Sequence, residues 1–75
     1  MPRLYNTGEV AKRSGLSQQV IYNYLNMNLI KEKKKTPAGR FLFDSSIFKR
    51  LELIKKLNQS GYALRDIREI FLKGG

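Results

Sequence analysis

Two short helix-forming segments separated by a glycine turn limit the folds open to this chain more than any other feature. Thr7 and Ser17 stand where a helix N-cap oxygen is needed, and Gly15 stands where the first segment has to end. The spacing predicts one helix over about residues 8–14 and a second over about residues 18–27. Two helices joined by so tight a turn are typical of a helix-turn-helix unit.

The second predicted helix has two chemically different faces. The apolar face is expected to enter the core and carries Val20, Ile21, Tyr24 and Leu25. The opposite face is polar, almost uncharged, and carries Gln18, Gln19, Tyr22, Asn23 and Asn26. Amide and phenol groups both donate and accept hydrogen bonds, which suits base edges and phosphate oxygens. Because exposed helix faces more often carry Lys and Glu, we interpret this face as one that contacts DNA.

A lysine-rich hairpin is predicted directly after this helix. Strand-like runs at residues 29–33 and 40–43 flank residues 34–39, where Pro37 and Gly39 supply turn geometry. Five cations and a single acid lie between residues 31 and 40. We interpret the hairpin as a wing that contacts DNA phosphates, and the alternative is a solubilising edge whose lysines prevent strand pairing.

Composition narrows the class of protein. At 75 residues the chain is predicted to be one small domain, residues 1–75, and 15 Lys+Arg against 6 Asp+Glu give a formal charge of +9. That charge favours a polyanionic partner, nucleic acid ahead of a membrane surface. The absence of Cys and His excludes the usual zinc sites, thiol nucleophiles and histidine bases, so neither enzyme activity, metal nor cofactor is predicted. No apolar run is long enough to span a membrane, so a cytoplasmic, nucleoid-associated protein without membrane contact is expected.

Two more helices are predicted in the C-terminal part. The first extends from an N-cap at Ser45 or Ser46 to about residue 59, with a core stripe of Ile47, Leu51, Ile54 and Leu57. The second covers about residues 64–73, with Leu64, Ile67, Ile70 and Phe71 turned inward. Ion pairs four residues apart are expected at Glu52/Lys56, Arg65/Glu69 and Glu69/Lys73. The predicted fold is therefore mostly α, a winged helix-turn-helix of four helices with a two-stranded β-hairpin wing.

Five sequence blocks occur together in a recognisable order. They are residues 5–12, the turn Gly15-Leu16-Ser17, the set Ile21, Tyr24, Leu29 and Ile30, the wing pair Gly39 and Phe43, and the closing residues 51–54 and 61–67. In this order and spacing the chain resembles the DNA-binding domain of MerR-type transcriptional regulators over about residues 5–72. Two segments differ from the family pattern. Residues 22–25 replace Arg-Tyr-Tyr-Glu, and the wing arginine, Arg40, stands one position early, on the opposite strand face.

The resemblance implies sequence-selective binding of double-stranded DNA, with the second helix in the major groove and the basic wing on phosphates. It also implies homodimers, formed through a helix after this domain if the full-length protein has one, and an effector region beyond it. Both Tyr62 and Arg65 are implied as a second wing by the resemblance alone. The predicted DNA-binding residues are Thr7, Lys12, Arg13, Ser17, Gln18, Gln19, Tyr22, Asn23, Asn26, Lys33, Lys34, Lys35, Arg40, Tyr62 and Arg65.

Two other functions stay open at this point. An architectural accessory protein, of the excisionase or packaging type, can use the same winged fold to bend DNA. A protein-interaction module would instead use an apolar fringe at Phe48, Leu53 and Phe71.

Overall fold

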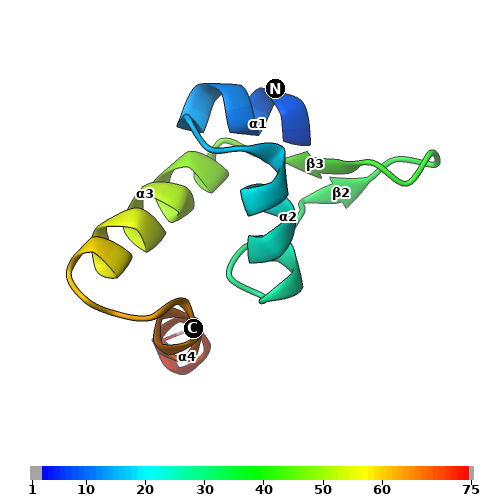
Figure 1. Cartoon of the computed structure of the whole chain (residues 1–75). Helices are drawn as coiled ribbons and strands as arrows, with labels where there is room; N and C mark the ends of the chain where they lie inside the picture. Colours follow the sequence, from blue (N-terminus) through cyan, green and yellow to red (C-terminus); the bar gives the residue numbers. More distant parts are fainter. Residues whose placement is uncertain (1–2, 75) are drawn as a thin grey trace.

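The computed structural model describes residues 3–74 and contains the four expected helices with a small sheet (Figure 1). In chain order the elements are β1 (Tyr5–Asn6), α1 (Thr7–Ser14), α2 (Gln18–Asn26), β2 (Lys34–Lys35), β3 (Phe41–Phe43), α3 (Ser46–Gln59) and α4 (Leu64–Gly74). The mostly α winged helix-turn-helix prediction is confirmed. Among the described residues no helix is long and apolar enough to cross a membrane.

The sheet has three strands, one more than the two-stranded wing predicted from the sequence. Strand β3 is central in the order β1-β3-β2, and both pairings are antiparallel, with Tyr5 opposite Phe43 and Lys35 opposite Phe41. The predicted first wing strand at residues 29–33 is wrong, because Leu29 and Ile30 are buried in the core and β2 begins only at Lys34. The turn is correspondingly shorter than predicted.

Helix α1 begins one residue earlier than predicted and has a different cap. The Asn6 side chain accepts a hydrogen bond from the Glu9 amide at 2.8 Å, and the Glu9 carboxylate accepts one from the Asn6 amide at 3.2 Å. This reciprocal capping box makes Asn6 the N-cap, so the prediction of Thr7 as cap is wrong. Thr7 instead opens the helix as a buried residue, 6% exposed.

The turn between α1 and α2 begins and ends at the residues predicted from the sequence. Gly15 adopts a left-handed conformation with φ of 78°, and its amide donates to the Ala11 carbonyl at 3.0 Å. Ser17 then caps α2 by accepting a hydrogen bond from the Val20 amide at 3.2 Å. A residue with a β-carbon is strained at positive φ, so glycine suits the point where α1 has to end.

A second left-handed residue ends α2 and turns the chain back into the core. Asn28 has φ of 61°, and the Leu29 amide reaches back to the Tyr24 carbonyl at 2.9 Å. This Schellman arrangement satisfies the last carbonyls of α2 and directs Leu29 inward. Asparagine adopts this conformation more readily than most residues, as expected for the position of Asn28.

The core lies where α1, α2, β3 and α3 meet, and α4 packs on the far end of α3 (Figure 1). Its fully buried side chains are Val10, Ile21, Leu29, Phe43, Ile54 and Ile67. The predicted stripe on α3 is confirmed at Ile47, Leu51 and Ile54, and Leu57 is half-buried beside it. On α4 the inward prediction fails at Ile70, which is 41% exposed on a helix that packs mainly against α3.

Three predicted side-chain contacts in the C-terminal half are absent, and adjacent residues make other contacts in their place. Ser45 precedes α3 without a side-chain cap bond, and the Asp44 carboxylate instead accepts hydrogen bonds from the Ser46 amide, at 3.0 Å, and hydroxyl. Glu69 approaches Arg68 at 3.6 Å rather than Arg65 or Lys73. The predicted Glu52–Lys56 pair is confirmed at 3.2 Å.

Candidate nucleic-acid interface

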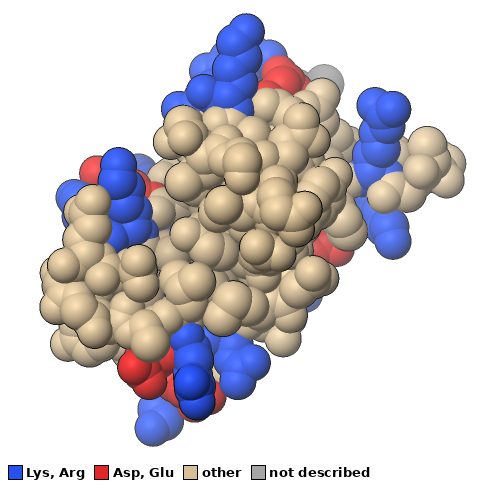
Figure 2. Space-filling model, viewed as in Figure 1, with Lys and Arg blue, Asp and Glu red and all other residues tan. Residues whose placement is uncertain are grey.

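Helix α2 lies between the wing and the end of α3 that leads into α4 (Figure 1). All five polar residues assigned to its outer face are exposed: Gln18, Gln19, Tyr22, Asn23 and Asn26. Figure 2 shows the middle of this face without charged side chains, whereas Lys and Arg stand at its edges and beside the projecting wing. An uncharged centre with a basic rim is the arrangement predicted for a helix that reads bases between phosphate contacts.

The structure separates the polar residues of α2 into two rows. Gln18 and Tyr22 face a groove toward α1 and the wing, which is also lined by Thr7 and Arg40. Gln19 and Asn23 lie on the outside, where the Gln19 amide donates to Asn23 Oδ1 at 3.2 Å, and Asn26 continues this row toward Leu64. The sequence could not distinguish the rows, because only the position of the wing decides which side of α2 becomes a groove wall.

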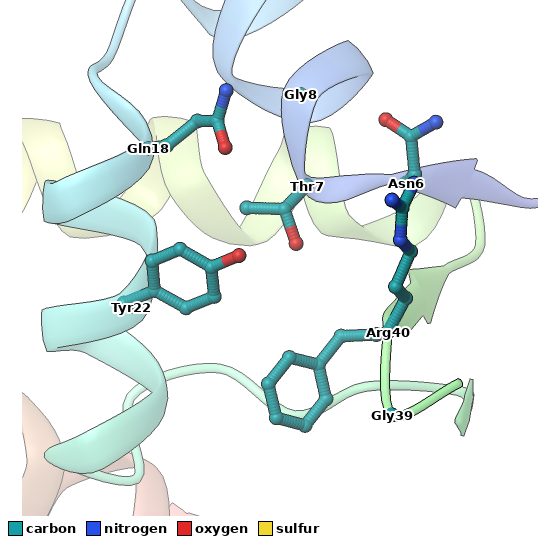
Figure 3. A pocket seen from close by; sticks show the side chains of 8 residues that line it. Asn6, Thr7, Gly8, Gln18, Tyr22, Gly39 and Arg40 are labelled. Atoms are coloured by element: carbon teal, nitrogen blue, oxygen red, sulfur yellow. The ribbon is translucent and has the colours of Figure 1, made fainter. Parts of the chain in front are cut away.

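The groove brings together four predicted DNA-binding residues from three elements (Figure 3). It has a volume of about 440 Å³ and is lined by Asn6, Thr7, Gly8, Gln18, Tyr22, Gly39, Arg40 and Phe41. Figure 3 shows the Thr7 and Tyr22 hydroxyls pointing toward the same space and the Arg40 side chain extending from the wing toward Asn6. None of these lining residues is acidic.

Phe41 and Gly8 are groove residues that sequence reasoning missed. The Phe41 ring lies 6.4 Å from the Tyr22 ring, at an interplanar angle of 59°, and the Lys35 ammonium lies 5.4 Å from the Phe41 ring centre. The contact between the two rings joins the wing to α2, whereas the contact of Lys35 with Phe41 lies within the wing. The alternation of Phe41 and Phe43 with Arg40 indicated one packing face, yet nothing in the sequence identified Tyr22 as the partner ring.

The wing turn is fixed by hydrogen bonds around Thr36. The Gly39 amide donates to the Thr36 carbonyl at 2.8 Å, and the Arg40 amide donates to the Thr36 hydroxyl at 3.0 Å. Gly39 has φ of 84°, a conformation that glycine adopts without strain. The turn thereby carries Lys34 and Lys35 on one strand and Arg40 at the start of the other, all exposed.

The Lys and Arg side chains of the wing form no ion pairs with carboxylates in the described part of the chain. Among residues 3–74, no carboxylate lies within ion-pair distance of Lys33, Lys34, Lys35 or Arg40. Hydrogen bonds from the Ser46 side chain and amide, together with the nearby Lys33 ammonium, hold the pKa of Asp44 below its ordinary value. Unpaired cations beside an uncharged helix face are suited to neutralising phosphates on either side of a base-reading element.

Other predicted site residues are placed outside the groove. Lys12 and Arg13 are exposed at the end of α1, and the Arg13 guanidinium lies 5.1 Å from the Tyr5 ring centre, on the side of α3. Ser17 is exposed and caps α2. Both Tyr62 and Arg65 are exposed where α3 gives way to α4, across α2 from the wing (Figure 1).

The apolar fringe considered for protein interaction is mostly engaged within the chain. The Phe48 ring packs edge-on against Tyr5 at 5.1 Å, and the Arg50 guanidinium covers the Phe71 ring at 4.0 Å. Leu53 is the member of this set that is largely exposed, at 44%. Two of the three residues therefore contribute to packing between elements.

Residues 5–73 match the family of MerR helix-turn-helix regulatory proteins, which is nearly the whole chain. The chain belongs to the MerR family. The Escherichia coli HTH-type transcriptional regulator ZntR is 30% identical over 67 residues, which are 89% of this chain and 48% of ZntR. The chain thus spans about half the length of this curated relative.

Two solved structures share the fold. MtaN, the N-terminal part of the Bacillus subtilis multidrug transporter activator, superposes with a TM-score of 0.82 at 30% identity, over 89% of this chain and 63% of MtaN. HiNmlR, a MerR-family regulator without its sensor domain, bound to promoter DNA, gives 0.82 at 24% identity over 91% of this chain and 54% of that one. The described chain is therefore the winged helix-turn-helix domain of a MerR-family protein.

Proposed function

We propose that this MerR-family domain binds double-stranded DNA sequence-selectively, as the DNA-reading part of a transcriptional regulator. The observation that carries the proposal is the uncharged amide face of α2, flanked on one side by the unpaired cations of the wing. Base edges are read by groups that donate and accept hydrogen bonds, and phosphates are neutralised by Lys and Arg. Family membership and relatives named as transcriptional regulators support the same role.

In this proposal α2 occupies the major groove and presents the outer row, Gln19, Asn23 and Asn26, to base edges. Lys33, Lys34, Lys35 and Arg40 contact the backbone on the wing side. Tyr62 and Arg65 contact it on the other side, and Lys12, Arg13 and Ser17 complete the phosphate contacts near the start of α2. If a helix follows this domain in the full-length protein, the whole protein would act through it as a homodimer on cytoplasmic nucleoid DNA.

Capture of sheared genomic DNA tests the proposal. Purified protein is mixed with the fragments at roughly physiological salt, where weak phosphate-only binding is largely suppressed, and the bound fragments are sequenced. Enrichment of a short motif is expected, and inverted repeats would indicate a two-fold partner. Uniform recovery of all sequences would contradict selective readout and favour an architectural DNA-binding role.

A further inference from the structure

The groove between α1, α2 and the wing contains a hydroxyl, that of Thr7, which opens on the groove and has no partner in the described part of the chain. Thr7 is 6% exposed, yet its hydroxyl makes no hydrogen bond to any residue in the part of the chain that the structure describes. Figure 3 shows that this hydroxyl points into the groove and faces the Tyr22 hydroxyl. A groove-wall hydroxyl that no protein group engages is free to donate a hydrogen bond to a ligand atom in the groove.

The charge around this hydroxyl favours an anion. The groove lies at the N-terminal end of α1, where the positive end of the helix dipole and the first amides are directed outward. Arg40 contributes a full positive charge from the wing, and no acidic residue lines the groove. The Glu9 carboxylate, in the first turn of α1, accepts a hydrogen bond from the Asn6 amide and pairs with Arg3 at 2.6 Å, and both contacts keep its pKa below the ordinary value.

Gly8 forms part of the groove wall between Asn6 and Gln18. A β-carbon on Gly8 would lie 3.3 Å from Asn6 Oδ1 and 3.7 Å from Gln18 Nε2. The first contact is tight and the second is an ordinary van der Waals contact, so a side chain at position 8 would press on the Asn6 cap. The Tyr22 ring lies 6.4 Å from the Phe41 ring, and Figure 3 shows the Tyr22 hydroxyl directed into the same space as the Thr7 hydroxyl.

We propose that this groove seats one backbone phosphate of DNA. The Thr7 and Tyr22 hydroxyls donate to its non-bridging oxygens, and Arg40 neutralises its charge. The proposal rests on the DNA-binding function above, and it assigns Tyr22 to a phosphate rather than to a base edge. The 440 Å³ groove is far larger than one phosphate group, which leaves room for the sugars on either side.

The test removes individual hydroxyl groups from the protein and, separately, individual phosphate charges from the DNA. Affinities for a random-sequence duplex and for a selected duplex are measured for the unmodified protein, Thr7→Val and Tyr22→Phe, which delete only hydrogen-bonding groups. Each variant is expected to bind both duplexes about tenfold more weakly, because a hydrogen bond to a charged group is lost. Thr7→Ser keeps the hydroxyl and should restore binding. Tyr24→Phe is the matched control on α2, because Tyr24 does not line this groove.

Duplexes that carry a neutral methylphosphonate at one linkage at a time identify the phosphate. Neutralising the linkage that occupies the groove should weaken binding by the unmodified protein. The same neutralisation should weaken binding by Thr7→Val or Tyr22→Phe only slightly, because these variants have already lost the contact. Additive losses at every linkage would overturn the phosphate seat. So would a loss confined to the selected duplex, because a phosphate contact acts on every sequence alike.

A second arm separates a DNA phosphate from a free one. Inorganic phosphate is titrated into the protein while the amide signals of Thr7 and Gly8 are followed by NMR. Weak, non-saturating shifts are expected, and tight saturable binding would overturn the assignment to DNA. Equal affinity of the unmodified protein for selected and random duplexes would contradict sequence-selective binding. The methylphosphonate experiment would still test whether the groove binds a phosphate. Binding to neither duplex would overturn both proposals.

Discussion

The wing and the α3–α4 layer are both rich in cations, but they organise them differently. On α3 and α4, Lys56 pairs with Glu52, Arg68 lies 3.6 Å from Glu69, and the Arg50 guanidinium covers the Phe71 ring. On the wing, the four cations at residues 33–35 and 40 have no carboxylate within ion-pair distance among residues 3–74. Among the described residues, ion pairs therefore occur on α3 and α4 and not on the wing, where Lys35 instead contacts the Phe41 ring.

The difference shows that net charge alone does not locate a nucleic-acid interface. A formal charge of +9 predicts a polyanionic partner without saying where it binds. The location of the cations relative to the proposed base-reading helix supplies that information. The cations of the wing lie beside the uncharged face of α2, which marks them as the candidates for contact with phosphates. The following experiments test this contrast, beginning with the largest expected effect.

Neutralising the wing is expected to abolish most DNA affinity. Replacing Lys33, Lys34, Lys35 and Arg40 with Gln should weaken binding to all sequences by about a hundredfold or more and lower the slope of log K against log salt by about four. Fluorescence anisotropy at several salt concentrations measures both quantities.

The matched control removes the same number of charges from the other region. Lys49, Lys55, Lys56 and Lys73, all exposed on α3 and α4, are replaced with Gln, which gives the same net charge as the wing variant. Binding should change by less than about threefold, since these cations do not face the duplex in the proposed orientation. A similar loss in both variants would show that total charge, rather than its placement, controls affinity.

Single changes in the outer row of α2 should alter selectivity instead. Gln19→Ala and Asn23→Ala are each expected to cost about 1–3 kcal/mol on the selected sequence and little on random DNA. Competition binding with the two duplexes measures the ratio, and Gln59→Ala on α3 is the control. Equal losses on both duplexes would place this row on phosphates.

The sequence predicts a feature well when residues close together in the chain determine it, and poorly when contacts between distant residues determine it. The α2 boundaries, the Gly15 turn, the Ser17 cap and the Glu52–Lys56 pair follow from residues within four positions of each other. All were predicted correctly. The third strand was missed, because two residues at positions 5 and 6 carry too weak a strand pattern until β3 pairs with them.

The groove illustrates the same limit within the candidate site. Thr7, Gln18, Tyr22 and Arg40 were each predicted as DNA-binding residues, but their meeting in one groove depends on how the wing folds over α2. Thr7 was predicted to cap α1 because Ser and Thr are common caps. The reciprocal bonds between Asn6 and Glu9 form instead, and they free the Thr7 hydroxyl for the groove.

The α1 cap that supports this groove can be compared with the start of α3. Asn6→Ala removes the bond to the Glu9 amide and should lower the free energy of unfolding by about 1 kcal/mol. Ser45→Ala should change it little, because Ser45 makes no cap bond. Thermal or urea unfolding measures both, and a comparable loss at Ser45 would contradict the assignment of the α3 cap to Asp44.

Acid should weaken both helix starts. Backbone and Arg3 hydrogen bonds lower the pKa of Glu9, and hydrogen bonds from Ser46 lower the pKa of Asp44. Because the folded pKa lies below the unfolded one, the stabilisation is complete above the unfolded pKa and is lost as the pH falls through the folded pKa, in the range below about 4. Unfolding measured across this range should show a shallower decline for Glu9→Gln and Asp44→Asn. An unchanged profile would mean that neither carboxylate is linked to folding.

The smallest effect is expected at the ion pair on α3. Glu52→Gln removes the partner of Lys56 at a site where both side chains are about two-thirds exposed, so the free energy of unfolding should fall by only about 0.3–0.5 kcal/mol, and less at high salt. The variant also leaves Lys56 as free as the wing cations. If α3 simply lacks a duplex to contact, DNA affinity should rise only slightly, through the general increase in positive charge. A rise in affinity as large as that from adding a lysine to the wing would contradict this expectation. It would show that the α3–α4 layer also faces DNA and that the Glu52–Lys56 pair lowers the affinity.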